Sequence, residues 1–191
     1  MNALDIDYVR SQFPALSSGY AYLDNAGGSA VLKPVADRVS DYLLNSAVQL
    51  GASYSESVNA GARVMQARES VAQLINARYP EECVMGGSTT HLLQILCRAL
   101  APSIGPGDEI VVTDCDHEAN IGPWMKLCEE RGATLRVWGV GLNSMELELA
   151  DLEALLSANT RYVAMTHASN ILGSVNPVAE VARRVHAVGA K

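Results

Sequence analysis

The segment from Glu109 to Asn120 reads EIVVTDCDHEAN, and it indicates the architecture of the chain better than any other. Its apolar and β-branched first part, 109–113, predicts a buried strand. A helix is expected around Ala119–Arg131, because Gly132 suits the position just after a helix. A strand that leads through a polar loop into a helix is the unit from which α/β folds are built.

The same strand-to-helix unit recurs on both sides of that segment. The other expected strands are Cys83–Met85, Thr134–Val140 and Arg161–Thr166, and the accompanying helices are Thr89–Leu100, Leu149–Ser157 and Pro177–Val188. This alternation predicts an α/β fold with a mostly parallel sheet of about four strands, right-handed crossovers and helices on both faces. The last helix closes at Gly189, so the sheet is incomplete in this chain and is expected to have an exposed edge.

The first third of the sequence predicts mainly helices. They are expected over Asp5–Phe13, from Lys33-Pro34 to Asn45, and over Ser55–Asn76. Tyr20–Leu23 is strand-like, and the residues that follow it, Asp24-Asn25-Ala26-Gly27-Gly28-Ser29, predict a tight turn.

Composition excludes several classes of protein. The chain has 191 residues, of which 49% are apolar and 18% charged, and this balance argues against wholesale disorder. A net charge of −7 argues against a nucleic-acid-binding surface, which needs clustered Lys and Arg. No apolar run is long enough to span a membrane, and the four cysteines lack zinc-site spacing, so we expect a cytoplasmic protein with no metal site.

Ligands of parallel sheets bind at the carboxyl ends of the strands, which directs attention to three loops. The first is Gly86-Gly87-Ser88-Thr89-Thr90, where backbone amides at a helix start and three hydroxyls suit an anion. Ser88 can equally be a simple helix N-cap. The loop is not a Walker motif, because no Gly-Lys-Ser/Thr follows.

The other two loops offer a ring and an amide. His117 follows the strand 109–113 and can stack on a flat ring, bind metal or act as a base, although taken singly it suits a surface or capping histidine. A metal site there would need Cys115 or Asp116 together with His167, a set without standard spacing. Asn170 provides a donor and an acceptor, or simply belongs to a polar turn. Together, the three loops suit a flat, phosphorylated aromatic cofactor.

With these motifs the sequence resembles the class V aminotransferase group of fold-type I pyridoxal-phosphate enzymes, and within it the cysteine desulfurase-like branch. The matching segments occur in the family's order and cover nearly the whole chain: Tyr22–Gly28, Gly87–Thr90, Gly105–Val112, Asp116–Trp124 and Thr166–Pro177. The resemblance implies that residues 51–191 form part of the large, cofactor-binding domain. Residues 1–50 would contribute to the small domain and to a substrate loop.

The resemblance also implies roles for single residues. Ser88, Thr89 and Thr90 would hold the phosphate of pyridoxal 5′-phosphate, His117 would stack on its ring, and Asn170 would contact its phenolic oxygen. Asn25, Ala26 and Gly27 would lie on the substrate side. The chain departs from the family at His91, where many relatives have Glu, and near Gln49–Gly51, where many have a His-Arg pair.

The family's catalytic residues are expected beyond Lys191. They are the Asp that protonates the pyridine nitrogen and the Lys that forms the Schiff base. The only lysines here are Lys33, Lys126 and Lys191, and none occupies the Schiff-base position. The resemblance therefore implies no catalytic residue in this chain, weak or absent cofactor binding, and no activity for the chain alone.

Three functional hypotheses follow. The first is the N-terminal half of an amino-acid-transforming enzyme, through truncation, an incomplete gene or a split subunit, homodimeric as in the family or completed by another chain. Its reaction would be cysteine desulfuration, transamination or epimerisation of a small amino acid. The second is a non-catalytic remnant. The third is a nucleotide-binding Rossmann-like module, which Gly139-Val140-Gly141 supports poorly because no third glycine follows.

Overall fold

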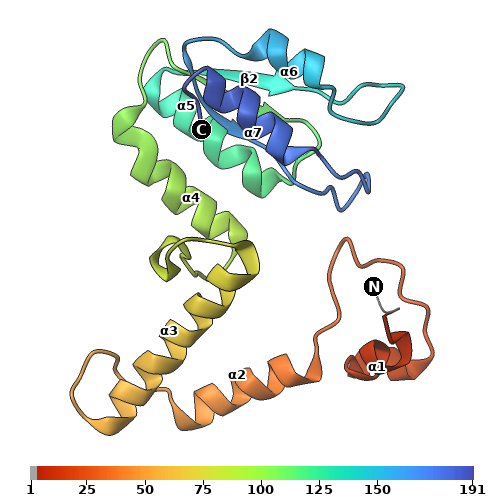
Figure 1. Ribbon diagram of the computed structural model, residues 1–191, viewed down its shortest axis with the longest axis vertical. Helices are drawn as coiled ribbons and strands as arrows, with labels where there is room; N and C mark the ends of the chain where they lie inside the picture. The colour runs from red at the N-terminus through yellow and green to blue at the C-terminus, as the bar shows by residue number, and fades with distance from the viewer. Residues whose placement is uncertain (1–3) are drawn as a thin grey trace. The chain divides into compact units, whose positions relative to one another are not determined.

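The computed structural model describes residues 4–191, and the chain divides into two compact units between Val84 and Met85 (Figure 1). The first unit contains α1 (Ile6–Ser11), η1 (Pro14–Ser18), α2 (Lys33–Asn45), α3 (Ser55–Ile75) and η2 (Pro80–Glu82). Its three expected α-helices are confirmed.

In the described part of the chain, no helix combines the length and the apolar composition that crossing a membrane requires.

Polar contacts tie α2 to α3 in the first unit. The Arg63 guanidinium on α3 pairs with the Asp41 carboxylate at 2.6 Å and donates to the Ser46 hydroxyl at 2.6 Å. It also lies 5.1 Å from the centre of the Tyr42 ring. One side chain thus contacts three residues at the end of α2.

The prediction of a strand at Tyr20–Leu23 is wrong. This segment has no regular secondary structure, and the described residues offer it no strand to pair with. Alternating aromatic residues favour a strand only where a neighbour accepts their backbone hydrogen bonds. The turn after it is present: the Gly27 amide donates to the Asp24 carbonyl at 3.2 Å.

The second unit holds the strand–helix alternation. Its elements are α4 (Thr89–Leu100), η3 (Ala101–Ser103), β1 (Glu109–Thr113), η4 (Glu118–Asn120), α5 (Gly122–Arg131), β2 (Thr134–Trp138), α6 (Leu149–Leu155), β3 (Thr160–Ala164) and α7 (Val178–Ala187). The helix expected from Ala119 begins at Gly122, after a 3-10 turn, with Pro123 in its first turn. Gly132 ends it in the left-handed conformation, at φ 69°, as expected.

The sheet is parallel and has three described strands in the order β2-β1-β3, so the expectation of about four strands is wrong. Cys83–Met85, the expected fourth strand, is not a strand. Residues 83–85 pair with none of the three described strands, and an unpaired segment cannot form a ladder. At the outer edge of β3, Lys191 donates to the Arg161 carbonyl and accepts from the Val163 amide, each at 2.9 Å.

Alternate residues of β1 supply two apolar cores, one on each face of the sheet. Ile110 and Val112 pack with residues of α4 and α5, among them Trp124. Val111 faces the other way and packs with Trp138 and with residues of α6 and α7. The expected helices on both faces of the sheet are therefore confirmed.

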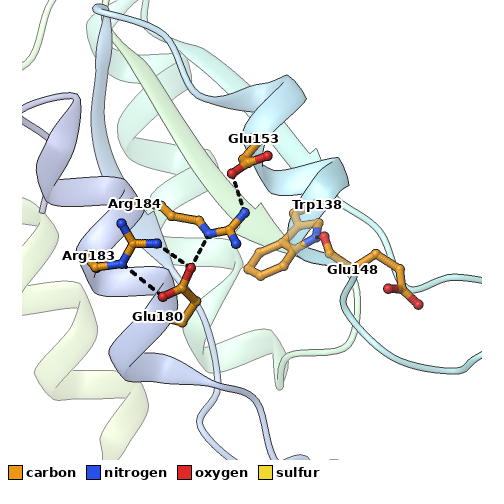
Figure 2. A network of polar contacts seen from close by, with 6 residues as sticks. All are labelled: Trp138, Glu148, Glu153, Glu180, Arg183 and Arg184. Carbon is orange, nitrogen blue, oxygen red and sulfur yellow. Dashed lines mark hydrogen bonds and ion pairs between the residues drawn. The ribbon is translucent and has the colours of Figure 1, made fainter.

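An ion-pair network joins α6 to α7 (Figure 2). The Glu180 carboxylate pairs with Arg183 at 2.6 Å and with Arg184 at 2.7 Å, and Arg184 also pairs with Glu153 of α6. The indole of Trp138, which is fully buried, donates to the Glu148 carbonyl at 3.0 Å just before α6 begins. The Arg184–Glu153 pair thus joins α7 to α6, and the Trp138 hydrogen bond joins the start of α6 to β2 of the sheet.

This network predicts acid sensitivity. Hydrogen bonds from Arg183 and then Arg184 lower the pKa of Glu180 from 4.5 to about 2. Because the folded-state pKa lies below the unfolded one, the stabilisation is complete above pH 4.5 and is lost as pH falls toward 2. We expect the free energy of unfolding, measured by urea denaturation, to fall less steeply over this range in Glu180→Gln than in the unmodified chain.

The matched control is Glu146→Gln, which removes an exposed carboxylate in the loop before α6. Its pH profile should follow that of the unmodified chain. Identical profiles for Glu180→Gln and Glu146→Gln would contradict the role of the network.

Candidate functional site

The turn before α4 has the N-cap and the exposed amides and hydroxyls that its sequence indicated. Ser88 is extended, and its hydroxyl accepts a hydrogen bond from the His91 amide at 3.2 Å, so the N-cap is confirmed. The amides of Thr89 and Thr90 belong to the first turn, which has no acceptors within its own helix. All three side chains, Ser88, Thr89 and Thr90, are exposed to solvent. An anion can therefore approach this helix start without displacing the cap.

Gly86 allows this turn to fold closely against its own helix. A Cβ atom at Gly86 would lie only 2.7 Å from a methyl carbon of Leu92. A larger residue there would push Leu92 aside and shift the backbone that leads into Ser88.

His117 lies just after β1, where its ring is held by the backbone. Its Nδ1 accepts from the Ala119 amide at 3.0 Å, and its carbonyl accepts from the Asn120 amide at 2.8 Å. The capping interpretation of this histidine is thus confirmed. With Nδ1 accepting, the neutral ring carries its proton on Nε2. The side chain is exposed, so a planar group can approach the ring.

A cavity of about 500 Å³ brings two of the expected residues together. It runs along α4 and α5, which pack side by side in the second unit, and its wall includes Thr90 and His117. Ser88, Thr89 and Asn170 are not part of its wall. The wall also has two cations that the sequence analysis did not assign to a site, Arg98 and Lys126.

A further residue missed from sequence is Asp116, which was considered only as a metal ligand. One oxygen of its carboxylate accepts from the Thr113 hydroxyl at 2.6 Å and from the Thr166 amide at 2.8 Å. The other accepts from the Asn120 side-chain amide at 3.1 Å. Asp116 therefore links the end of β1 to the residues that follow β3.

Asn120 in turn contacts α5. Its side-chain oxygen accepts from the indole of Trp124 at 3.2 Å. The three residues recur at a spacing of four but lie on different elements, Asp116 in the loop after β1, Asn120 in η4 and Trp124 in α5, so no single helical pattern in the sequence indicated these contacts.

Asn170 lies in a turn between β3 and α7, which confirms the polar-turn interpretation. Ala168 and Val175 form an antiparallel bridge across the turn. Ser169 is buried, and its amide donates to the Ser174 carbonyl at 3.0 Å. Asn170 is exposed beyond this bridge. Contact of Asn170 with a cofactor stays a prediction.

The expected substrate-side residues Asn25, Ala26 and Gly27 belong to the first unit, where all three are exposed. A Cβ atom at Gly27 would lie 3.2 Å from the Asp24 carboxylate, so glycine allows a close return there. Their role toward a substrate stays a prediction.

The buried thiols are poor candidates for nucleophiles. Burial, aided by nearby Cys128, raises the pKa of Cys97 to about 11, and burial also raises the pKa of Cys128. Both are therefore thiols rather than thiolates near neutral pH. Among residues 4–191, no three His, Cys, Asp or Glu side chains are grouped so that they could hold a metal ion.

Comparisons with known proteins identify the family of this chain. Residues 21–191 match the family described as aminotransferase class-V. The chain is 42% identical to the aminotransferase-like protein FGM3 of Gibberella zeae, over 98% of this chain and 47% of that protein. It is 39% identical to a cysteine desulfurase of Dickeya dadantii, over 97% of this chain and 47% of that protein.

Solved structures give the same result. The chain superposes on the cysteine desulfurase CsdA of Escherichia coli with a TM-score of 0.85 and 28% identity, over 99% of this chain and 48% of that one. The corresponding values for the apo cysteine desulfurase of Thermococcus onnurineus are 0.88 and 28%, over 100% and 47%. The chain thus spans about half the length of the relatives it matches.

The cap at Ser88 can be tested by stability. Ser88→Ala removes the acceptor for the His91 amide and should lower the free energy of unfolding by about 1 kcal/mol. Ser103→Ala is the matched control, because the Ser103 hydroxyl donates to the carbonyl of Leu100, the last residue of α4, and accepts from no amide of the first turn. Equal destabilisation of the two variants in urea denaturation would contradict the assignment of the cap.

Proposed function

We propose a function for this chain from one premise: it belongs to the class-V aminotransferase family, and its α/β fold is that of the fold-type I cysteine desulfurase structures. The chain would supply the phosphate-binding, ring-stacking and amide-bearing part of a pyridoxal-phosphate site. The observation that carries this proposal is the shared cavity, whose wall includes Thr90 from the first turn of α4 and His117 from the loop after β1.

The residues present fit pyridoxal 5′-phosphate. The cavity volume of about 500 Å³ lies in the range of small-molecule sites. Phosphate suits the start of α4, where first-turn amides and the hydroxyls of Ser88, Thr89 and Thr90 can donate to it. The positive end of the helix dipole adds to this preference for an anion.

Two further side chains would orient the cofactor ring. His117 would stack on it, since the Ala119 amide holds Nδ1 and fixes the imidazole in place. Asn170 would donate to its phenolic oxygen. When bound, the cofactor supplies an electron sink for reactions at the α-carbon of an amino acid. Orienting the ring and excluding other poses would be the contribution of these residues.

The groups that tether the cofactor and protonate its ring nitrogen would come from a further polypeptide segment. The relatives are about twice as long as this chain, which supports that view. Lys126 reaches the cavity wall, but it lies on α5 and is 3.7 Å from Glu130. We propose no catalytic role for it, and we expect the chain alone to be inactive.

The whole enzyme would act on a small amino acid. Cysteine desulfuration is our first choice, because relatives such as that of Dickeya dadantii are cysteine desulfurases. A homodimer or a complementing chain, together with a cytoplasmic location, completes the proposal. A non-catalytic remnant would share the cavity but would never acquire turnover in any complex.

Cofactor affinity tests the stacking role. In His117→Ala, the dissociation constant for pyridoxal 5′-phosphate should rise by about tenfold, the equivalent of roughly 1.4 kcal/mol. Absorbance titration of the 191-residue chain measures it. His186→Ala, at the exposed end of α7, is the control and should bind as the unmodified chain does. Equal affinities for the two variants would overturn the stacking role.

Turnover tests the need for a second segment. Without the tethering lysine, a general base is missing, which alone costs about 10²–10⁴-fold in rate. We expect the purified chain with pyridoxal 5′-phosphate, in the presence of a thiol reductant that accepts the sulfur, to form alanine from cysteine no faster than the free cofactor does. Alanine formation well above that blank, or a single borohydride-trapped cofactor adduct on Lys126, would contradict the proposal.

A further inference from the structure

We propose that Asp116 is a positioning residue, whose carboxylate holds the loops bearing His117 and Asn170 in one fixed arrangement. The importance of that arrangement for a cofactor rests on the proposed function. The arrangement itself follows from contacts within the second unit and involves residues on three elements, β1, η4 and the loop after β3.

The first loop is closed around His117. The Asp116 carboxylate accepts from the side-chain amide of Asn120, so a hydrogen bond of 3.1 Å spans the turn. Within it, the Asn120 amide donates to the His117 carbonyl, and the Ala119 amide donates to Nδ1 of the same residue. These three contacts leave the imidazole little freedom to change its plane.

The second loop is held through Thr166. Its amide donates to the Asp116 carboxylate at 2.8 Å, which joins the residues after β3 to those after β1. Its carbonyl accepts from the side-chain amide of Asn176 at 2.8 Å, and the Asn176 backbone amide donates to the His167 carbonyl at 2.8 Å. Asn176 is only 4% exposed. The base of the turn that carries Asn170 is thus anchored from both sides.

A carboxylate is required at position 116 because donors face both of its oxygens. The Thr166 amide and the Asn120 side-chain NH₂ group can only donate. Asn120 cannot turn its oxygen toward position 116, because that oxygen accepts from the indole of Trp124. An asparagine at position 116 would therefore leave its own NH₂ group facing another donor. Two donors without an acceptor between them cost more free energy than the same groups exposed to water, where each is hydrogen-bonded.

Asp114 provides a matched control two residues away. Its carboxylate accepts from the Val140 amide at 2.9 Å, so it also connects the end of β1 to a neighbouring loop. That loop follows β2 and carries none of the expected cofactor-binding residues. Asp114→Asn thus makes the same chemical change at the same end of the sheet.

The experiment compares the unmodified 191-residue chain with Asp116→Asn and Asp114→Asn by nuclear magnetic resonance. In Asp116→Asn, the Thr166 amide should exchange with solvent at least about tenfold faster, since local opening becomes easier. The His117 ring and Asn170 side-chain signals should also shift. Asp114→Asn should affect the Val140 amide and leave those signals unchanged. Matching spectra for the two variants at Thr166 and His117 would overturn the proposal.

A second variant covers the case in which Asp116→Asn does not fold. Asn120→Asp keeps the acceptor for Trp124 and places a carboxylate against that of Asp116, so the two side chains repel each other and the contact across the His117 turn is lost. We expect the His117 ring signals to shift while the Thr166 amide stays protected. An unchanged His117 spectrum in this variant would contradict the positioning role.

These signals require no cofactor, so the two proposals can fail separately. Titration of the same variants with pyridoxal 5′-phosphate addresses the function. If His117→Ala binds the cofactor as tightly as the unmodified chain does while Asp116→Asn frees both loops, the proposed function fails and the positioning contact stands. If the unmodified chain binds and Asp116→Asn binds as tightly as Asp114→Asn does, the positioning role toward the cofactor fails.

Discussion

The pairing of β1 with a parallel strand on each side is the constraint on which the second unit depends. Ile110, Val111 and Val112 are at most 1% exposed, because their side chains enter the cores on the two faces of the sheet in turn. Such burial removes apolar surface from water, worth about 1.5–3 kcal/mol for each large side chain. The chain becomes polar where β1 ends, because no apolar core covers the carboxyl ends of the strands.

That polar end of the sheet carries most of the candidate site. The residues after β1 and β3 are separated by about fifty positions in sequence, yet the Asp116 carboxylate and the Thr166 amide are 2.8 Å apart. The start of α4 brings first-turn amides to the same unit, and Thr90 shares a cavity wall with His117. The site thus combines the ends of two adjacent parallel strands with the start of a helix, and the carboxyl ends of parallel strands are where ligands of such sheets bind.

Sequence reasoning located β1 at Glu109–Thr113 because a buried strand bounded by polar residues has a clear local pattern. The same reasoning was wrong at Cys83–Met85, since propensity cannot supply a pairing partner. Ser88 and His117 were recognised as candidates from residue type and position. The hydrogen bonds of Asp116 were missed because one of them is to the Thr166 amide. That amide lies near Asp116 only because of the register in which β1 pairs with β3.

The most direct test of a cofactor site in this half is a contact map between pyridoxal 5′-phosphate and the isotopically labelled chain. We expect nuclear Overhauser effects between the ring methyl group of the cofactor and the imidazole protons of His117. We also expect the largest amide shifts at Thr89 and Thr90, where the phosphate would bind. Contacts confined to other cationic surfaces, such as Arg183 on α7, would contradict a cofactor site formed by the start of α4 and the loops after β1 and β3.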